Sequence, residues 1–221
     1  MIDYIAILDY DHLDNGLFLA SLANALATRG EERGLLIHGD SAYTERLLQT
    51  GVMREEARIR AMRDLNHRLI ALLADHGVSA IGLNGHQRGL VKQDSKNGEI
   101  RLDTAQLQNL PDTPHLVLSA LGESDSGERT SIPLPDLATA ISRQLSIQRI
   151  YIFHTSDDRE ILTDKEPEET SQHPNGHVLN REEIPDGFHS MSIAVQLTTA
   201  RQFTSLRPDS VLIRPSSSAA T

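Results

Sequence analysis

The chain has no cysteine and no tryptophan among its 221 residues, and aromatic residues make up only 4% of it. The lack of cysteine excludes disulfides and thiolate metal sites, and it suits the reducing cytoplasm, where we expect the protein to reside. Few aromatic residues predict a core built from Leu, Ile, Val and Ala. No apolar run is long enough to span a bilayer, and the apolar stretch at the start of the chain is typical of a strand.

Positive charge is also scarce. The 21 Lys and Arg residues are outnumbered by 31 Asp and Glu residues, which gives a formal net charge of -10. A uniformly anionic surface argues against a nucleic-acid backbone or an anionic membrane as a partner. A composition with 38% hydrophobic and 24% charged residues is typical of a soluble globular protein that buries a large core.

Short apolar runs alternate with amphipathic segments along the chain. We expect strands over residues 4–8, 33–40, 78–83, 114–121, 148–153 and 209–215. We expect helices over residues 17–30, 41–52, 55–77, 135–145 and 188–203. This alternation predicts an α/β fold with a mainly parallel sheet, covered on both faces, and with ligands at the carboxyl ends of the strands.

Two further segments are expected to lie outside the regular elements. Residues 155–177 are acidic and contain proline, which is typical of an exposed loop. We expect residues 216–221, SSSAAT, to form a disordered tail.

One stretch, GVSAIGLNGHQRGLVK (residues 77–92), places two apolar runs around a glycine-bearing turn. It resembles the strand G-x-x-A-V-G-L-S-G-x-D-G-x-L-I of acetylglutamate kinases, which belong to the amino-acid kinase family. Weaker resemblances follow in the family's chain order, and together they cover most of the chain. In this chain, IHGDSAYTERLL (37–48) resembles the family's V-H-G-G-G, and LNHRLIALL (65–73) resembles V-N-K-x-L-V-x-x-L. Further along, IPLPDLATAI (132–141) resembles N-x-N-A-D-x-x-A-x-x-I, and DGFHSMSIAVQL (186–197) resembles G-G-M-x-x-K-V.

The resemblance implies one domain, residues 1–215, folded as a three-layer αβα sandwich with a mainly parallel central sheet. Residues 1–145 would form the half that binds a carboxylate substrate, and residues 146–215 a remnant of the nucleotide-binding half. The implied substrate-binding residues are His38, Gly39, Asp40, Arg54, Arg58, Asn84 and Gly85. The implied nucleotide-side positions are Asp9, Tyr10, Asp11 and Met191, and the implied catalytic residue is Asp136.

Most of the groups that would handle phosphate are replaced. Phosphoryl transfer requires cations, backbone donors and magnesium around the equatorial oxygens. Leu8 and Met191 stand where the family has lysines, and Asp40 stands in a glycine turn that approaches phosphate. We therefore expect a non-catalytic homologue that needs no cofactor and binds a small acidic metabolite or a partner subunit.

Two alternatives remain open from the sequence. The first is a working phosphotransferase for acylated amino acids, which would use ATP with magnesium and arginines from elsewhere, such as Arg88 or Arg54. The second is a structural subunit of a kinase complex. Members of the amino-acid kinase family usually form oligomers, so we expect a homodimer with helices from the amino-terminal half at its interface.

The candidate residues also have simpler structural interpretations. Asp136, which follows a proline at a predicted helix start, is typical of a capping residue or a partner of the helix dipole. The arginines at 54, 58, 60 and 63 are the strongest candidate for an anion-binding cluster, but Glu55 and Glu56 beside them favour a solvated helix face. His173 and His177 favour a loop over a metal site, so no metal site is predicted. We expect the turns after the first two strands, residues 83–89 and Asp136 to face one cleft.

Overall fold

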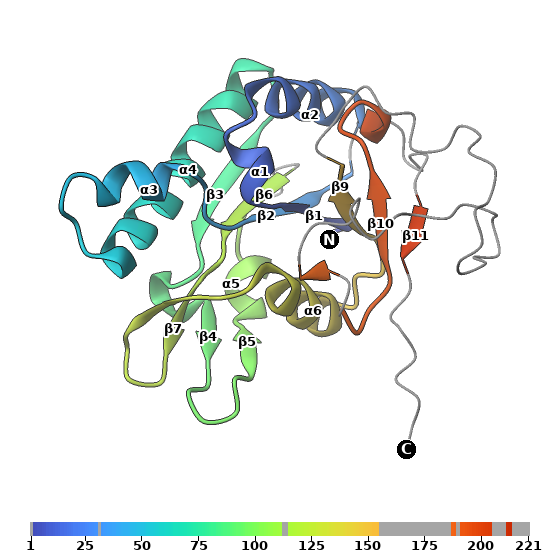
Figure 1. Cartoon of the computed structure of the whole chain (residues 1–221). Coiled ribbons are helices and arrows are strands. Elements are labelled where there is room, and N and C mark those ends of the chain that lie inside the picture. The colour runs from blue at the N-terminus through green and yellow to red at the C-terminus, as the bar shows by residue number, and fades with distance from the viewer. Residues whose placement is uncertain are drawn as a thin grey trace, which may run out of the picture.

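A seven-stranded sheet forms the centre of the computed structural model (Figure 1), which describes residues 2–30, 32–111, 115–154, 187–188, 191–204 and 211–213. The strands lie in the order β11-β10-β9-β1-β2-β6-β3. In chain order they are β1 (Tyr4–Leu8), β2 (Gly34–His38), β3 (Ala80–Asn84), β6 (His115–Ser119), β9 (Ile150–Phe153), β10 (Val195–Thr198) and β11 (Val211–Ile213). Neighbouring strands are parallel except β11, which runs antiparallel to β10.

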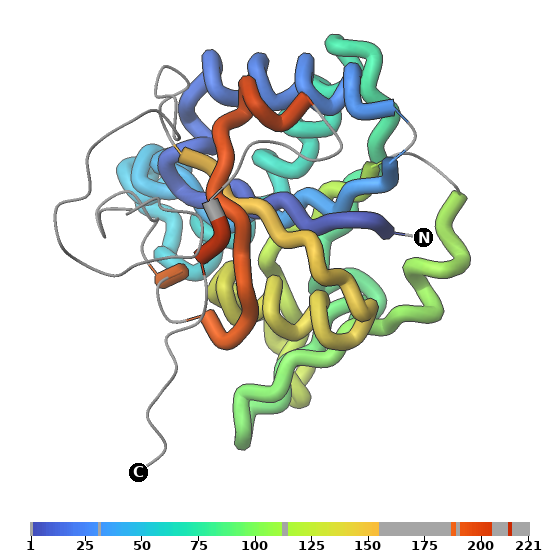
Figure 2. Tube along the Cα trace, turned by 90° about the vertical axis from the view of Figure 1, so that its right-hand side faces the viewer, coloured from blue at the N-terminus to red at the C-terminus, as the bar shows by residue number. Residues whose placement is uncertain are grey.

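Helices cover both faces of this sheet. The elements α1 (Tyr10–Leu13), α2 (Gly16–Thr28), α3 (Tyr43–Leu48) and α4 (Arg54–Asp75) lie toward one face, and α5 (Thr104–Gln108) and α6 (Leu134–Leu145) toward the other. Figure 2 shows the strands between α2 above and α6 below. The predicted three-layer αβα sandwich with a mainly parallel sheet is therefore confirmed.

The side chains of β1 explain why both faces must be covered. Because side chains alternate along a strand, Tyr4 and Leu8 pack toward α2 and α4, whereas Ile5 and Ile7 join the cluster that includes α6. All five residues of β1 are buried, as are those of β2 and β6. Such uninterrupted apolar runs are characteristic of parallel strands with helices on both sides.

A second, four-stranded sheet extends from the end of β3 below the main sheet in Figure 1. Its order is β5-β4-β7-β8, and its strands are β4 (Val91–Gln93), β5 (Ile100–Leu102), β7 (Leu121–Ser124) and β8 (Arg129–Ser131). A 3-10 turn, η1 (Gln87–Gly89), joins β3 to β4. The chain passes very close to β7 here, since a Cβ atom on Gly85 would lie 2.0 Å from the carbonyl oxygen of Leu121.

All six predicted strands are present, but the helix predicted over residues 188–203 is wrong. Its described part contains β10 and a 3-10 turn, η4 (Gln202–Thr204). Val195 and Leu197 point into the core while Gln196 is half-buried, which is the period of two of a strand, and the segment pairs with β9. Residues 155–177 and 216–221, with His173 and His177, lie outside the described residues. In the described part, no helix is long and apolar enough to cross a membrane.

Candidate functional site

The turns after β1 and β2 meet at one edge of the sheet, because the two strands pair along their whole length and Leu8 lies opposite His38. In the second of these turns, the Asp40 carboxylate accepts the backbone N–H of Ser41 at 2.8 Å and the hydroxyl of Thr44. Its other oxygen lies 3.4 Å from Nε of Arg58. The carboxylate of Asp40 is thus engaged at the start of α3.

The turn after β1 carries its own internal contact. The Asp9 carboxylate lies 2.5 Å from Nδ1 of His12, whose ring is buried and lies 4.2 Å from the ring of Phe18. Tyr10 is 47% exposed, and Asp11 is exposed as well. Of the three predicted nucleotide-side residues in this turn, Asp9 faces the protein interior and the other two face solvent.

The two positions that resemble the family's lysines belong to the core. Leu8 is 0% exposed and lies in the cluster formed with α2 and α4. Met191 is 5% exposed and lies in the opposite cluster, together with Phe188 and Leu137 of α6. A lysine ammonium at either position would be surrounded by apolar side chains, an environment that disfavours the charged form.

His38 takes part in a buried hydrogen-bond network. Its Nε2 atom accepts from the side-chain amide of Asn66 at 3.2 Å, and its Nδ1 atom lies 3.1 Å from the carbonyl oxygen of Gly39. Burial lowers the pKa of His38 to about 4, so the ring is neutral and Nδ1 donates to that carbonyl. The carbonyl oxygens of Leu83 and Val117 also lie within 3.2 Å of the Asn66 amide, so its two N–H groups are shared among three acceptors. The network therefore fastens α4 to the ends of β2, β3 and β6.

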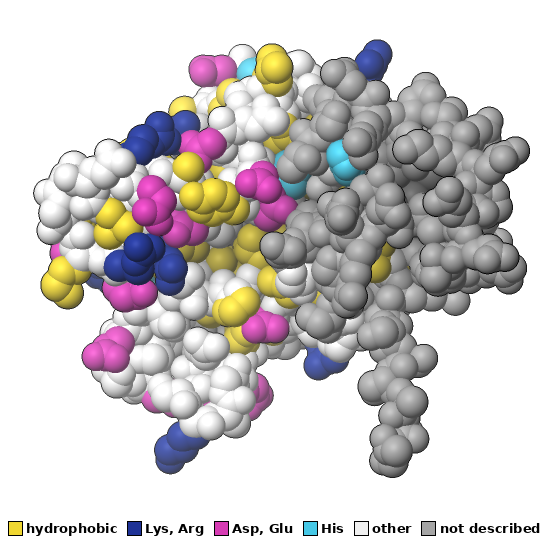
Figure 3. All heavy atoms as spheres, viewed as in Figure 1, with side chains coloured by type: hydrophobic (Ala, Val, Ile, Leu, Met, Phe, Trp, Pro, Cys, Tyr) yellow, Lys and Arg dark blue, Asp and Glu magenta, His cyan; other side chains and the backbone are white. Residues whose placement is uncertain are grey.

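The predicted arginines on α4 are paired with acids at the surface. Arg54 lies 3.2 Å from Glu45, with both side chains more than half exposed, and Arg58 contacts Glu55 in addition to Asp40. Figure 3 shows basic and acidic side chains side by side over this region of the molecule. Solvent-exposed ion pairs of this kind contribute little to stability.

Asp136 and Asn84, expected in a common cleft, line different hollows. Asp136 is exposed in the first turn of α6, whose N-cap residue is Pro133, and its carboxylate lies favourably for the helix dipole. Its hollow is shared with Met191 and Arg143. Asn84 is buried at the end of β3 and accepts the hydroxyl of Ser119 at 3.3 Å. Gly85 is buried next to it, at the close approach to β7.

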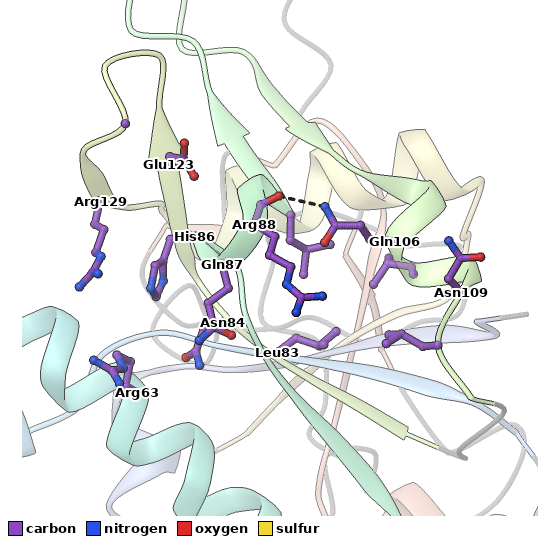
Figure 4. A pocket seen from close by; sticks show the side chains of 14 residues that line it. Arg63, Leu83, Asn84, His86, Gln87, Arg88, Gln106, Asn109, Glu123 and Arg129 are labelled. Carbon is purple, nitrogen blue, oxygen red and sulfur yellow. Dashed lines mark hydrogen bonds between the residues drawn. The ribbon is translucent and has the colours of Figure 1, made fainter.

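The hollow at Asn84 is an open cleft of about 930 Å³ between α4 and the small sheet (Figure 4). Three arginines from three different elements line it, and we call it the arginine cleft: Arg63 comes from α4, Arg88 from η1 and Arg129 from β8. In Figure 4 Arg129 extends from the small sheet toward α4, Arg63 reaches up from that helix, and His86 lies beside them.

The charges of these arginines are not neutralised by neighbouring acids. In the described part of the chain, no guanidinium of Arg63, Arg88 or Arg129 forms an ion pair, although Glu123 lines the same cleft. The arginines of the described residues that do form ion pairs are those at 29, 46, 54, 58, 101 and 149. The arginine cleft therefore concentrates positive charge in a chain whose formal net charge is -10.

His86 adds a polar group to the arginine cleft. Its Nδ1 atom is buried and has no hydrogen-bond partner among the described residues. Burial, and then the positive charges of Arg129 and Arg63, lower the pKa of His86. The ring is therefore neutral near pH 7, with one nitrogen able to donate and the other able to accept a hydrogen bond.

The backbone of Arg88 is held in an unfavourable conformation. Its φ of 53° lies in the left-handed region, which costs a residue other than glycine about 1 kcal/mol or more. The side-chain amide of Gln106 donates to the carbonyl of Arg88 at 3.0 Å, which holds this turn against α5. Strained residues of this kind occur preferentially at functional sites.

Sequence reasoning identified part of the arginine cleft. Asn84 was predicted to bind substrate, and Arg88 entered as a replacement for a missing lysine. His86 lies within residues 83–89, which were expected to face a cleft, but no binding role was predicted for it, and Arg129 was not predicted to contribute. Arg129 reaches the cleft only through the small sheet, which sequence reasoning did not predict.

No family model and no curated protein sequence matches the chain. Solved structures do share its architecture. The smu.665 protein of Streptococcus mutans UA159 is 17% identical, with a TM-score of 0.63 over 98% of this chain and 100% of that one. An isopentenyl phosphate kinase is 13% identical, with a TM-score of 0.58 over 91% of this chain and 94% of that one.

A third solved structure is N-acetylglutamate synthase from Neisseria gonorrhoeae, complexed with coenzyme A and N-acetyl-glutamate. It is 16% identical, with a TM-score of 0.64 over 98% of this chain, and this chain spans 60% of its length. The chain has the amino-acid kinase fold. At these identities the likeness concerns the fold, and the amino-acid kinase fold by itself does not specify a reaction.

Proposed function

We propose that this protein is a non-catalytic member of the amino-acid kinase fold that binds a small acidic metabolite. The observation that carries the proposal is the burial of Leu8 and Met191, which occupy the positions of the expected phosphate-contacting lysines with exposures of 0% and 5%. Loss of one transition-state cation typically costs about 10³–10⁵ in rate. Loss of two would leave little phosphoryl transfer.

The turn after β2 supports the same conclusion. Asp40 stands where the resemblance places a phosphate-approaching glycine, and its carboxylate is held there by Ser41, Thr44 and Arg58. A carboxylate in this position places negative charge toward a nucleotide phosphate, and like charges at short range repel.

The arginine cleft does not replace the missing lysines. It lies at the end of β3, which is separated from β1 by β6 and β2. At about 4.8 Å per strand, the ends of β3 and β1 are about 14 Å apart, farther than an arginine side chain reaches. Arg88, the residue that the active-enzyme alternative would use, therefore favours a separate binding site for an anion over a rewired kinase centre.

A coupled ATPase assay and a hydroxamate assay with Mg-ATP and N-acetyl-glutamate test the proposal. We expect no turnover above background, and an equal signal from the Asp136→Ala variant. We also expect the melting temperature to rise with a small acidic ligand such as N-acetyl-glutamate and not with Mg-ATP. Turnover of about 1 per second, a rate at the lower end for ordinary enzymes, would overturn the proposal if the Asp136→Ala substitution abolished that turnover.

A further inference from the structure

We infer that the arginine cleft is the binding site of this protein, and that its ligand carries a carboxylate or phosphate head on a short carbon chain. The inference rests on the proposed function, which it deepens by naming the site and the ligand class. The cleft lies apart from the turns after β1 and β2, where the resemblance to kinases placed the ligands.

The charge distribution points to an anion. Arg63, Arg88 and Arg129 come from three separate elements and converge on one cleft without ion-pair partners in the described part of the chain. The 31 Asp and Glu residues outnumber the 21 Lys and Arg residues, and other arginines of the chain do form ion pairs with them. Arginine is suited to such a role because its planar guanidinium donates two parallel hydrogen bonds to a carboxylate or phosphate.

Polar groups beside these arginines suit the remaining oxygens of such a head. The buried Nδ1 atom of His86 has no partner among the described residues, and the pKa of His86 is lowered partly by Arg129 and Arg63, which places both charges close to the ring. Asn84 uses its side-chain oxygen to accept the Ser119 hydroxyl, which leaves its amide as a donor at the cleft. The head thus meets donors from α4, β3 and β8 together.

The other part of the arginine cleft is apolar. Leu83 of β3, Leu107 of α5 and Leu110, which follows α5, line it. Its volume of about 930 Å³ is that of a small-molecule site. A cleft that combines guanidinium groups, which have no ion-pair partners among the described residues, with leucine side chains favours a ligand with a compact charged head and a short carbon chain, and it disfavours a bare inorganic ion.

Isothermal titration calorimetry on the full chain tests the inference with two probes. N-acetyl-glutamate supplies carboxylate heads and isopentenyl phosphate supplies a phosphate head, while acetate and inorganic phosphate supply the heads alone. We expect one of the two larger probes to bind, and the corresponding small ion to bind more weakly. Which larger probe binds distinguishes a carboxylate from a phosphate ligand.

Substitutions then show whether the probe that binds does so in the arginine cleft. Arg63→Gln and Arg129→Gln each remove an exposed charge from the cleft, and we expect each to weaken binding by about tenfold to a hundredfold. Arg54→Gln is the matched control, because it also removes an exposed charge from the same helix as Arg63, at a position that the kinase resemblance implies. We expect Arg54→Gln to bind like the native chain. Melting temperatures check that all three variants fold.

The outcomes separate the inference from the proposed function. Binding that is lost in Arg54→Gln and retained in Arg63→Gln and Arg129→Gln would overturn the inference while the non-catalytic function stood. Binding of neither probe to the native chain would also overturn it. Turnover of Mg-ATP in the assays described above would instead overturn the proposed function.

Discussion

Replacing Leu8 with lysine would restore the side chain that the kinase resemblance expects at the end of β1. In this protein the position is part of the core, because Leu8 is fully buried and packs in the cluster formed with α2 and α4. We therefore expect Leu8→Lys to destabilise the fold and to produce no kinase activity. Leu8→Met is the matched control, since it keeps volume and apolar character and typically costs less than about 1.5 kcal/mol.

The size of the effect follows from the burial of the ammonium. Full burial lowers a lysine pKa by about 3–5 units from about 10.4, and at the larger of these shifts the side chain is neutral at pH 7. Keeping the lysine neutral at pH 7, about 3 pH units below its ordinary pKa, lowers the free energy of unfolding by about 4 kcal/mol, at 1.36 kcal/mol per pH unit. This penalty is a large part of the about 5–15 kcal/mol that stabilises a typical domain. The penalty shrinks as the pH rises toward 10, because the lysine of the unfolded chain then loses its proton as well.

Urea unfolding followed by far-UV circular dichroism measures this effect in a chain without tryptophan. We expect Leu8→Lys to be about 4 kcal/mol less stable than Leu8→Met at pH 7, and we expect the gap to narrow at pH 10. If Leu8→Lys matched Leu8→Met in stability and also gained Mg-ATP turnover, the position would be part of a catalytic site and the reasoning would be refuted.

Three further predictions concern the buried network, acid stability and assembly. Asn66→Ala leaves three buried acceptors without their shared donor and should cost about 3 kcal/mol in urea unfolding, whereas His67→Ala on the exposed face of α4 should cost little. Burial lowers the folded-state pKa values of His38 and His115 to about 4, below the unfolded value of about 6.5. The unfolded chain therefore binds more protons than the folded one in this pH range. The stabilisation is complete above pH 6.5 and is lost as the pH falls through 4, by about 3 kcal/mol per histidine. Urea midpoints measured from pH 8 to pH 4 test this loss. We also expect a homodimer, and a monomeric mass by light scattering at micromolar concentration would contradict it.

The main sheet could be predicted from the sequence because its signals are local and strong. Apolar runs such as YIAIL in β1 and LLIH in β2 read directly as buried parallel strands. The helix predicted over β10 is wrong, because the run from Ser192 to Leu197 is compatible with both periods and pairing with β9 decides in favour of a strand. Tertiary pairing of this kind leaves no trace in a single short segment.

The small sheet and most of the arginine cleft could not be predicted. The strands β4, β5 and β8 are three residues long, too short for a period to be recognised. Arg129 comes within reach of Arg63 only because these strands return the chain over α4, across 66 residues of sequence (129 minus 63). Asn84 was found because it follows a recognisable strand directly. Residues gathered by long-range pairing carry no such signal.

A crystal structure of the protein grown with N-acetyl-glutamate or isopentenyl phosphate, together with magnesium and a non-hydrolysable ATP analogue, tests the central claim most directly. We expect density for the small ligand in the arginine cleft, with its charged head between Arg63 and Arg129, and no triphosphate at the ends of β1 and β2. A magnesium-bound triphosphate beside Asp9 and Asp40, with the small ligand facing its terminal phosphate, would contradict the account.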